Sequence, residues 1–132
     1  MDVDGTSFQD TLFQGCRLEG VQFARCRRLL LSFSFDRCML RLASFASLDI
    51  RDTRFNGCEL YEADFSESDL RGAVFADCDL LRAIFMHTNL EKADFRTARN
   101  YSFSPDLNRI RNARFCLPEL TGLLEGYGIR IE

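Results

Sequence analysis

The segment Ala63–Phe95 reads ADFSE SDLRG AVFAD CDLLR AIFMH TNLEK ADF, and a large apolar residue recurs in it at every fifth position. This period fits neither an α-helix, whose side chains repeat about every 3.6 residues, nor a β-strand, whose side chains alternate every two. The backbone must therefore turn a corner in each unit, which predicts a solenoid. The same period extends back to Phe35 without a break.

Each five-residue unit has two positions that we expect to point inward. The large position alternates between an aliphatic residue and phenylalanine, and the phenylalanines are Phe35, Phe45, Phe55, Phe65, Phe75, Phe85 and Phe95. A small residue usually stands two positions earlier, with cysteine there at Cys38, Cys58 and Cys78. A polar residue usually separates the two, so the triplet reads in, out, in, as in local β geometry.

Four triplets resemble the consensus of the pentapeptide-repeat family, Ala-Asp/Asn-Leu/Phe-X-X: Ala63-Asp64-Phe65, Ser68-Asp69-Leu70, Thr88-Asn89-Leu90 and Ala93-Asp94-Phe95. The resemblance covers residues 6–100. It implies an all-β solenoid, a right-handed quadrilateral β-helix of about five coils with four units in each coil. Four units of five residues make a step of 20 residues from one coil to the next. The sequence agrees with this step, because like residues recur 20 positions apart, as Cys58 and Cys78 do.

The period slips once in the N-terminal part of the chain. Phe23 and Phe35 are twelve positions apart where the period requires ten. We therefore predict a bulge near residues 24–30 that loops out Arg27 and Arg28, because two unpaired arginines would not enter an apolar core. No capping segment is recognisable before the first repeat, so we expect a bare N-terminal end, covered by a self-contact or by an upstream segment.

The slip sets a register of 22 residues between the first two coils, which places Cys16 below Cys38. Cysteines stacked in this way point in the same direction, which disfavours disulfides. The chain has no Cys-x-x-Cys pair, and its single histidine, His87, occupies an outward position. We therefore expect small buried thiols, no metal and no cofactor. With no phosphate-binding loop and no histidine beside a nucleophile, we expect no enzymatic activity.

The C-terminal part departs from the repeat. Within a single domain, residues 1–132, we expect an irregular last coil over 101–115, then a capping helix and a terminal strand over 117–132. Pro118 opens the helical segment, and Ile129-Arg130-Ile131 alternates like a strand. The ending resembles the C-terminal segment of the gyrase-interacting, quinolone-resistance-like members of the family, which implies a homodimer. The candidate cap or dimer residues are Leu117, Leu120, Leu123, Leu124 and Tyr127.

The charges bound the possible partners. The chain carries a net charge of −3, has no apolar run long enough to span a membrane and begins without signal-peptide character, so we expect a cytoplasmic protein. The resemblance to the quinolone-resistance-like members implies a bacterial one. Arginines outnumber acidic residues from Arg17 to Arg54, but the negative net charge of the chain argues against direct nucleic-acid binding. The candidate acidic interaction surface is Glu59, Glu62, Asp64, Glu67, Asp69, Asp77 and Asp79.

Two functions remain open at this point. The first is a non-enzymatic protein–protein interaction module whose partner is unknown. The alternative follows from the family resemblance, which includes proteins that mimic DNA and bind gyrase: a modulator of a type II topoisomerase that contributes to inhibitor resistance. The two differ in charge, because a DNA mimic requires a continuous negative strip along the solenoid.

Overall fold

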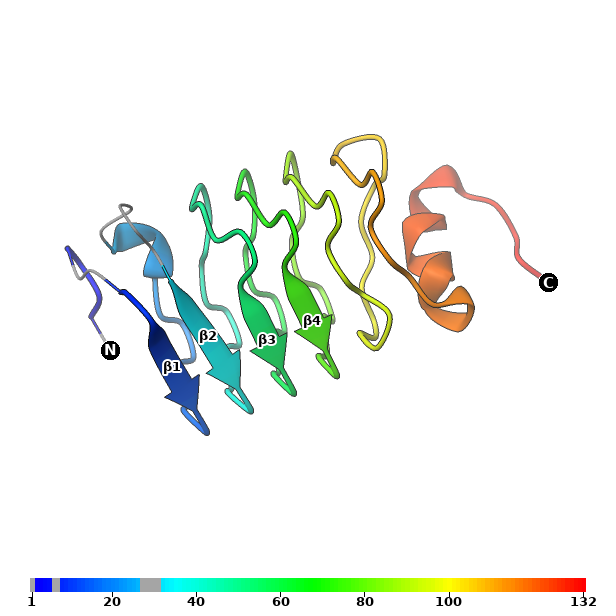
Figure 1. Ribbon diagram of the computed structural model, residues 1–132. Coiled ribbons are helices and arrows are strands. Elements are labelled where there is room, and N and C mark those ends of the chain that lie inside the picture. The colour runs from blue at the N-terminus through cyan, green and yellow to red at the C-terminus, as the bar shows by residue number, and fades with distance from the viewer. Residues whose placement is uncertain (1, 6–7, 27–31) are drawn as a thin grey trace.

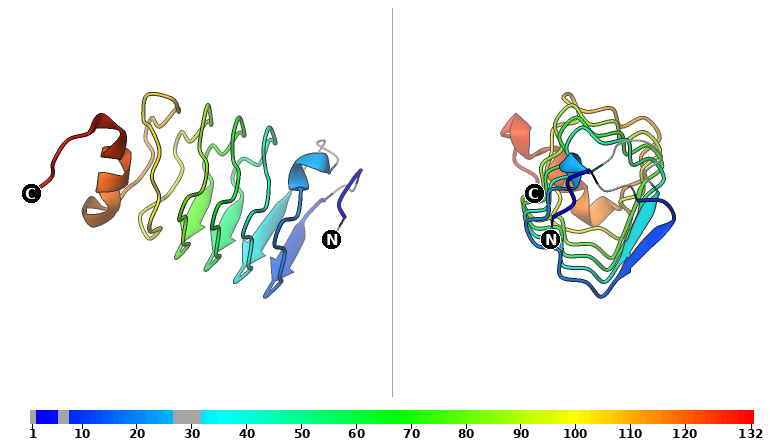
Figure 2. Two further views of the ribbon diagram at one scale, coloured as in Figure 1. Left: turned by 180° about the vertical axis from the view of Figure 1, so that it is seen from behind. Right: turned by 90° about the vertical axis from the view of Figure 1, so that its left-hand side faces the viewer.

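A computed structural model describes residues 2–5, 8–26 and 32–132, and these form a parallel β solenoid (Figure 1). One side of the solenoid is a parallel sheet in which the strands follow one another in chain order. The strands are β1 (Thr11–Gln14), β2 (Phe33–Asp36), β3 (Arg54–Asn56) and β4 (Val74–Ala76). A view along the axis shows the coils superimposed on one another (Figure 2).

The register between coils follows the sequence. Phe35 pairs with Phe55, and Phe55 with Phe75, a step of 20 residues. Parallel bridges outside the strands keep this step as far as Asp94 and Arg114. Phe13 pairs with Phe35 across a step of 22, which confirms the predicted change of register. The bulge residues Arg27 and Arg28 lie outside the described residues.

Most of the described corners contain one residue in the left-handed conformation, two positions after the large apolar residue. Gly57 and Gly72 occupy two of these corners, but Glu62 (φ 57°) and Asp77 (φ 53°) adopt the same conformation. The left-handed region costs a non-glycine residue roughly 1–2 kcal/mol. The corner amide of Glu62 recovers part of this cost by donating to the carbonyl oxygen of Leu81 in the next coil, at 2.9 Å.

The core is built from columns of phenylalanine rings. Phe55 and Phe75 stack with a centroid separation of 5.1 Å and an interplanar angle of 1°, and Phe65 and Phe85 stack at 5.1 Å and 8°. Rings of the two columns meet edge to face, as Phe65 and Phe75 do at 5.7 Å and 84°. Both geometries are favourable for aromatic quadrupoles. The phenylalanines of the predicted ladder form these two columns.

The cysteine column lies beside this aromatic core. Cys38, Cys58 and Cys78 are buried free thiols, and Cys16, below them, is partly exposed. Each buried thiol donates to a carbonyl oxygen of the preceding coil, at distances of 3.2–3.7 Å. Among the described residues, no group of three or more potential ligands could hold a metal ion.

The N-terminal end is not bare, which corrects the sequence-based expectation. Val3 is buried, with 2% of its surface exposed, and the amide of Gly5 donates to the carbonyl oxygen of Arg25 at 3.1 Å. This second contact reaches η1 (Phe23–Arg25), a single 3-10 turn. The described residues before the first repeat therefore cover part of the core, because Val3 gains burial there.

The C-terminal end carries two 3-10 helices, η2 (Leu117–Leu123) and η3 (Glu125–Tyr127). Leu123 is buried, and the carbonyl oxygen of Gly122 accepts the amide of Phe103 at 3.2 Å, which fixes η2 on the last coil. The predicted terminal strand over 129–131 is wrong: these residues are exposed and unassigned to any strand. A strand needs a neighbour to satisfy its backbone groups, and η2 occupies this end of the solenoid.

Within the described part of the chain, no helix has the length and apolar character needed to cross a bilayer.

Candidate interaction surfaces

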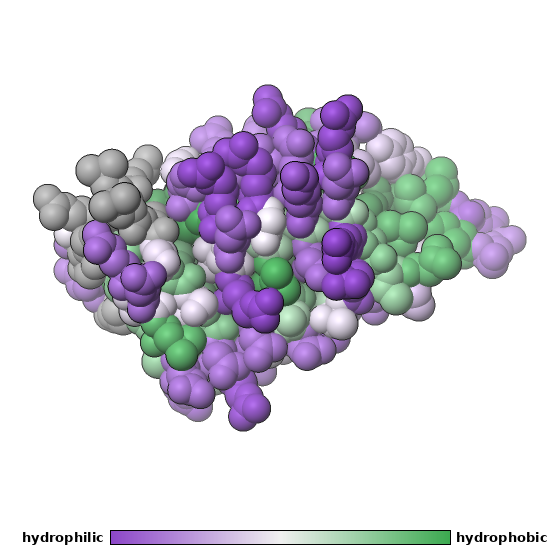
Figure 3. Space-filling view, viewed as in Figure 1, coloured by the Kyte–Doolittle hydropathy of each residue, from purple (hydrophilic) through white to green (hydrophobic). Residues whose placement is uncertain are grey.

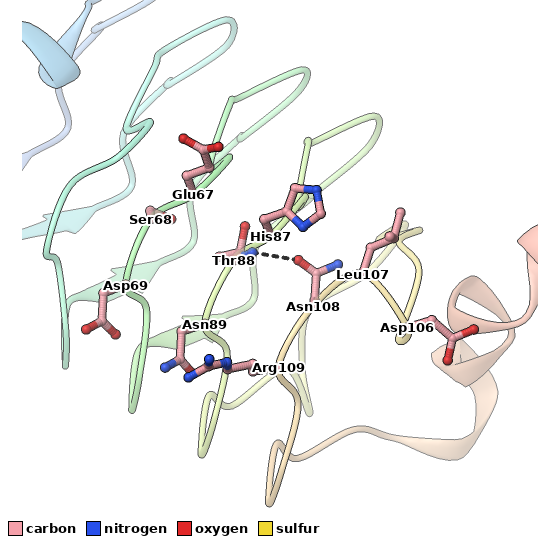
Figure 4. A pocket seen from close by; sticks show the side chains of 10 residues that line it. All are labelled: Glu67, Ser68, Asp69, His87, Thr88, Asn89, Asp106, Leu107, Asn108 and Arg109. Carbon is pink, nitrogen blue, oxygen red and sulfur yellow. Dashed lines mark hydrogen bonds between the residues drawn. The ribbon is translucent and has the colours of Figure 1, made fainter.

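An open groove of about 490 Å³ runs along successive coils (Figure 4). Two rows of outward side chains form its walls: Glu67, His87 and Leu107 in one, Asp69, Asn89 and Arg109 in the other. Asn108 closes the floor, because its side-chain oxygen accepts the amide of Thr88 at 2.9 Å. The groove is open to solvent and polar, which suits contact with another surface better than enclosure of a small molecule.

The hydroxyl groups of the groove donate hydrogen bonds to the backbone. Ser68 donates to the carbonyl oxygen of Phe65 at 2.6 Å, and Thr88 donates to the same oxygen at 2.8 Å. A catalytic hydroxyl would instead donate to a general base. The histidine of the groove, His87, is exposed. Both hydroxyl groups therefore have a structural role: Thr88 joins two neighbouring coils, and Ser68 bonds within its own coil.

The seven predicted acidic residues do not form a strip along the solenoid. They occupy outward positions over little more than one coil, with none between Asp69 and Asp77, and therefore lie on several faces. The structure stacks Glu59 on Asp79 in adjacent coils, as expected from the 20-residue step. Asp64 and Asp69 are on consecutive five-residue units and so lie on neighbouring faces, and Asp77 begins the following coil.

Arginines compensate several of these acids. Arg71 lies 2.7 Å from Asp69, Arg82 lies 3.9 Å from Glu62, and Arg99 lies 3.9 Å from Asp79. Partial burial opposes ionisation of Asp69, but hydrogen bonds from Arg71 outweigh this effect, and the pKa of Asp69 is lowered. Three of the seven acidic residues therefore have an arginine within 4.0 Å.

The predicted cap or dimer residues divide into two groups. Leu123 is buried, while Leu120 and Leu124 are partly buried. Leu117 and Tyr127 face solvent, with 82% and 51% of their surfaces exposed. The first group is part of the cap, and the second is free for contact with another molecule.

Sequence reasoning missed two further residues at this end, Ile129 and Ile131, which are 55% and 56% exposed. Their alternating pattern was the available signal, and it predicts a strand rather than a surface. Together with Leu117 and Tyr127 they form what we call the apolar end. Figure 3 shows apolar residues gathered toward the C-terminal end, beside a hydrophilic central part.

Sequence reasoning also missed an apolar cluster on the coils. Ile84, Met86 and Leu107 are 44%, 47% and 45% exposed. The sequence contained a signal for this cluster, because Ile84 occupies an outward position of the repeat that is usually polar. A single exposed apolar residue is unremarkable in a soluble protein, whereas a contiguous group indicates a contact surface.

These features define a class of protein: a parallel β solenoid of five-residue units, with a core filled by side chains and an outer surface exposed to solvent. The pentapeptide-repeat family model matches residues 63–99 in eight copies. This match shows that residues 63–99 are pentapeptide repeats, and the 20-residue step of the solenoid continues on both sides of them. No curated protein matches the chain by sequence.

The fold is also found in a solved structure. A trypsin-treated variant of QnrB1, a plasmid-mediated fluoroquinolone resistance protein, aligns with 99% of this chain and 63% of its own at 17% identity, with a TM-score of 0.58. The chain therefore spans less than two thirds of that structure. HetL, a pentapeptide-repeat protein involved in heterocyst differentiation regulation in the cyanobacterium Nostoc, aligns with 85% of this chain and 56% of its own at 18% identity, with a TM-score of 0.36.

Proposed function

We propose that the protein is a non-enzymatic protein–protein interaction module that forms a homodimer in the bacterial cytoplasm. We also propose that its solenoid is a right-handed quadrilateral β-helix of about five coils, since parallel crossover connections are almost always right-handed. The observation that carries the function is the apolar end. Leu117, Tyr127, Ile129 and Ile131 are each more than half exposed at the same terminus of the chain.

A second copy of the chain is the partner that we propose for the apolar end. Contiguous apolar surface is unfavourable in water, and its burial contributes roughly 25 cal/mol per Å². A two-fold contact would bury the same residues of both copies, which is how most homodimers are built. The outer faces of the coils would then remain available to a protein partner.

Sedimentation velocity on the purified protein tests this proposal. We expect a dimer for the unaltered chain and a monomer for Leu117→Asp, since an aspartate cannot be buried there unpaired. Leu12→Asp is the matched control, because Leu12 is 58% exposed on β1, in the first coil. A monomeric unaltered protein, or equal effects of the two substitutions, would contradict the homodimer.

The alternative function is a DNA-mimicking modulator of gyrase that contributes to inhibitor resistance. The structural likeness to QnrB1 over 99% of this chain favours it. The partial compensation of the acidic residues by arginines counts against it, since a mimic has to attract surfaces that bind a polyanion. We therefore rank it second.

A supercoiling assay with purified gyrase, with and without a fluoroquinolone, tests the alternative. A mimic would inhibit or protect the enzyme at low micromolar concentration. Replacing Glu59, Asp64, Asp69 and Asp79 by their amides should abolish that effect, whereas the same change at Glu19, Asp36, Asp49 and Asp52, in the arginine-rich part, should not. No effect of the folded protein at tens of micromolar would remove this function and leave the interaction module.

A further inference from the structure

Five residues of three adjacent coils form one continuous outer surface, which we call the acidic–apolar face: Asp64, Glu67, Ile84, Met86 and Leu107. Asp64 is bridged to Ile84 in the next coil. The amide of Glu67 donates to the carbonyl oxygen of Met86 at 2.9 Å, and the amide of His87 donates to that of Leu107 at 2.9 Å. These contacts place Asp64 beside Ile84 and Glu67 beside Met86, and His87, the residue after Met86, is bonded to Leu107 of the following coil.

The centre of this face is apolar and accessible. Ile84, Met86 and Leu107 keep 44–47% of their surfaces in solvent. They stand at outward positions, so none of them is needed to fill the core between the phenylalanine columns. The groove described above adjoins the face, because Glu67 and Leu107 belong to one of its walls (Figure 4).

Among the described residues, the carboxylates of this face lack the arginine partner that three other acids of the coils have. Asp49 and Asp69 are paired with Arg51 and Arg71 at 2.9 and 2.7 Å, and Asp94 is paired with Arg96 at 2.9 Å. No residue in the described part of the chain forms an ion pair within 4.0 Å with Asp64 or Glu67. Their partners are neutral: Asp64 accepts the amide of Ser66 at 2.9 Å, and Glu67 accepts the hydroxyl of Ser47 at 3.4 Å.

We infer that the acidic–apolar face binds a segment of a partner protein in which lysine or arginine side chains flank large apolar ones. This inference rests on the proposed interaction module and names the chemistry of its partner. Cations of the segment would meet Asp64 and Glu67, and its apolar side chains would cover Ile84, Met86 and Leu107. The same carboxylates would repel the phosphates of a nucleic acid or an anionic bilayer, which selects a protein over both.

Fluorescence anisotropy with labelled peptides of about 18 residues, or five helical turns, tests the inference. The first probe has lysine and leucine at amphipathic helical spacing. The second replaces its lysines by glutamate, and the third replaces its leucines by serine. We expect binding of the first probe, no binding of the second, and binding of the third that is weaker by about tenfold or more.

Two matched triple variants locate the contact. Asp64→Asn, Glu67→Gln and Ile84→Ser alter the proposed face and keep the hydrogen-bond acceptors of its side chains. Glu59→Gln, Glu62→Gln and Leu81→Ser make the same chemical change around Leu81, which is 45% exposed. We expect the first variant to bind the lysine–leucine probe about tenfold more weakly and the second to bind it within about twofold of the unaltered protein.

Equal weakening by both triple variants, or no binding of the probe, would overturn the inference. Neither outcome would contradict the proposed interaction module, because that proposal is tested by the loss of the dimer in Leu117→Asp. Conversely, a monomeric protein whose face binds the probe would retain this inference and refute the homodimer. Thermal unfolding of each variant checks that it keeps the fold, as expected when only outward side chains are changed.

Discussion

The thiol of Cys78 donates a hydrogen bond to the carbonyl oxygen of Phe55 in the preceding coil, at an Sγ–O distance of 3.3 Å. The hydrogen bond with Cys58 and the burial of the group raise the pKa of the Cys78 thiol above its ordinary value. Cys78 is therefore a neutral donor that joins its coil to the preceding one, and it keeps this role while its thiol stays protonated.

The first prediction concerns pH. The unfolded chain loses the Cys78 proton near pH 8.5 and the folded chain does not, so this contribution to stability is complete below that pH and falls above it. We expect a loss of about 1.4 kcal/mol per pH unit from this group. Urea unfolding at pH 7 and pH 10 measures it, with Cys78→Ala as the control that subtracts all other titrations. Identical pH slopes for the two proteins would show that the thiol does not contribute.

The second prediction concerns the phenylalanine ladder. Phe65 is fully buried, with a ring stacked above and below it, whereas Phe115 is partly buried at the C-terminal end of its column. Phe65→Ala should lower the free energy of unfolding by about 3–5 kcal/mol. Phe115→Ala should cost clearly less, because its ring leaves a smaller buried void. Urea unfolding compares the two, and equal losses would refute the role of the central stack.

The third prediction concerns the cap. A Cβ atom at Gly122 would collide with the carbonyl oxygen of Tyr101, whereas one at Gly126 would meet nothing within 4 Å. Gly122→Ala should therefore cost about 1–3 kcal/mol and loosen η2 from the last coil. Hydrogen exchange should accelerate over residues 117–127 while the strands stay protected. Gly126→Ala is the control, and similar exchange in both variants would argue against this contact.

The fourth prediction concerns the hydroxyl group of Tyr101. Within the described residues it is buried and has no hydrogen-bond partner, and burial raises the pKa of Tyr101 to about 12. Tyr101→Phe should therefore leave stability unchanged or raise it by about 1 kcal/mol, since it removes an unsatisfied polar group. Tyr127→Phe is the contrasting variant, because it loses a 2.8 Å hydrogen bond to Asp106 at the surface. Thermal unfolding distinguishes them, and a clear destabilisation by Tyr101→Phe would mean that the hydroxyl has a partner in solution.

Much of the fold could be predicted because burial constrains the inward positions. The step of 20 residues, the change to 22 at Phe13 and Phe35, and the stacking of Cys58 on Cys78 all follow from the requirement that like residues occupy like slots. The left-handed corners could not be predicted as a set. Gly57 and Gly72 hint at them, but Glu62 and Asp77 take the same conformation because the hydrogen bonds between coils impose it.

The candidate surfaces could be predicted only in part. The acidic residues were identifiable, but their distribution around the coil and the pairing of Asp69 with Arg71 depend on side chains that solvent leaves unconstrained. The strand expected at Ile129–Ile131 failed for a related reason: its alternation is local, whereas a strand forms only where a neighbouring backbone offers partners.

The sequence by itself therefore determined the solenoid, its step and the composition of its core, because each inward residue must fit the slot above and below it. Only the tertiary structure decided which outward residues lie together, such as Asp64 beside Ile84, and which of them remain free of a partner. Those neighbours come from different coils, and no burial requirement links their identities along the chain.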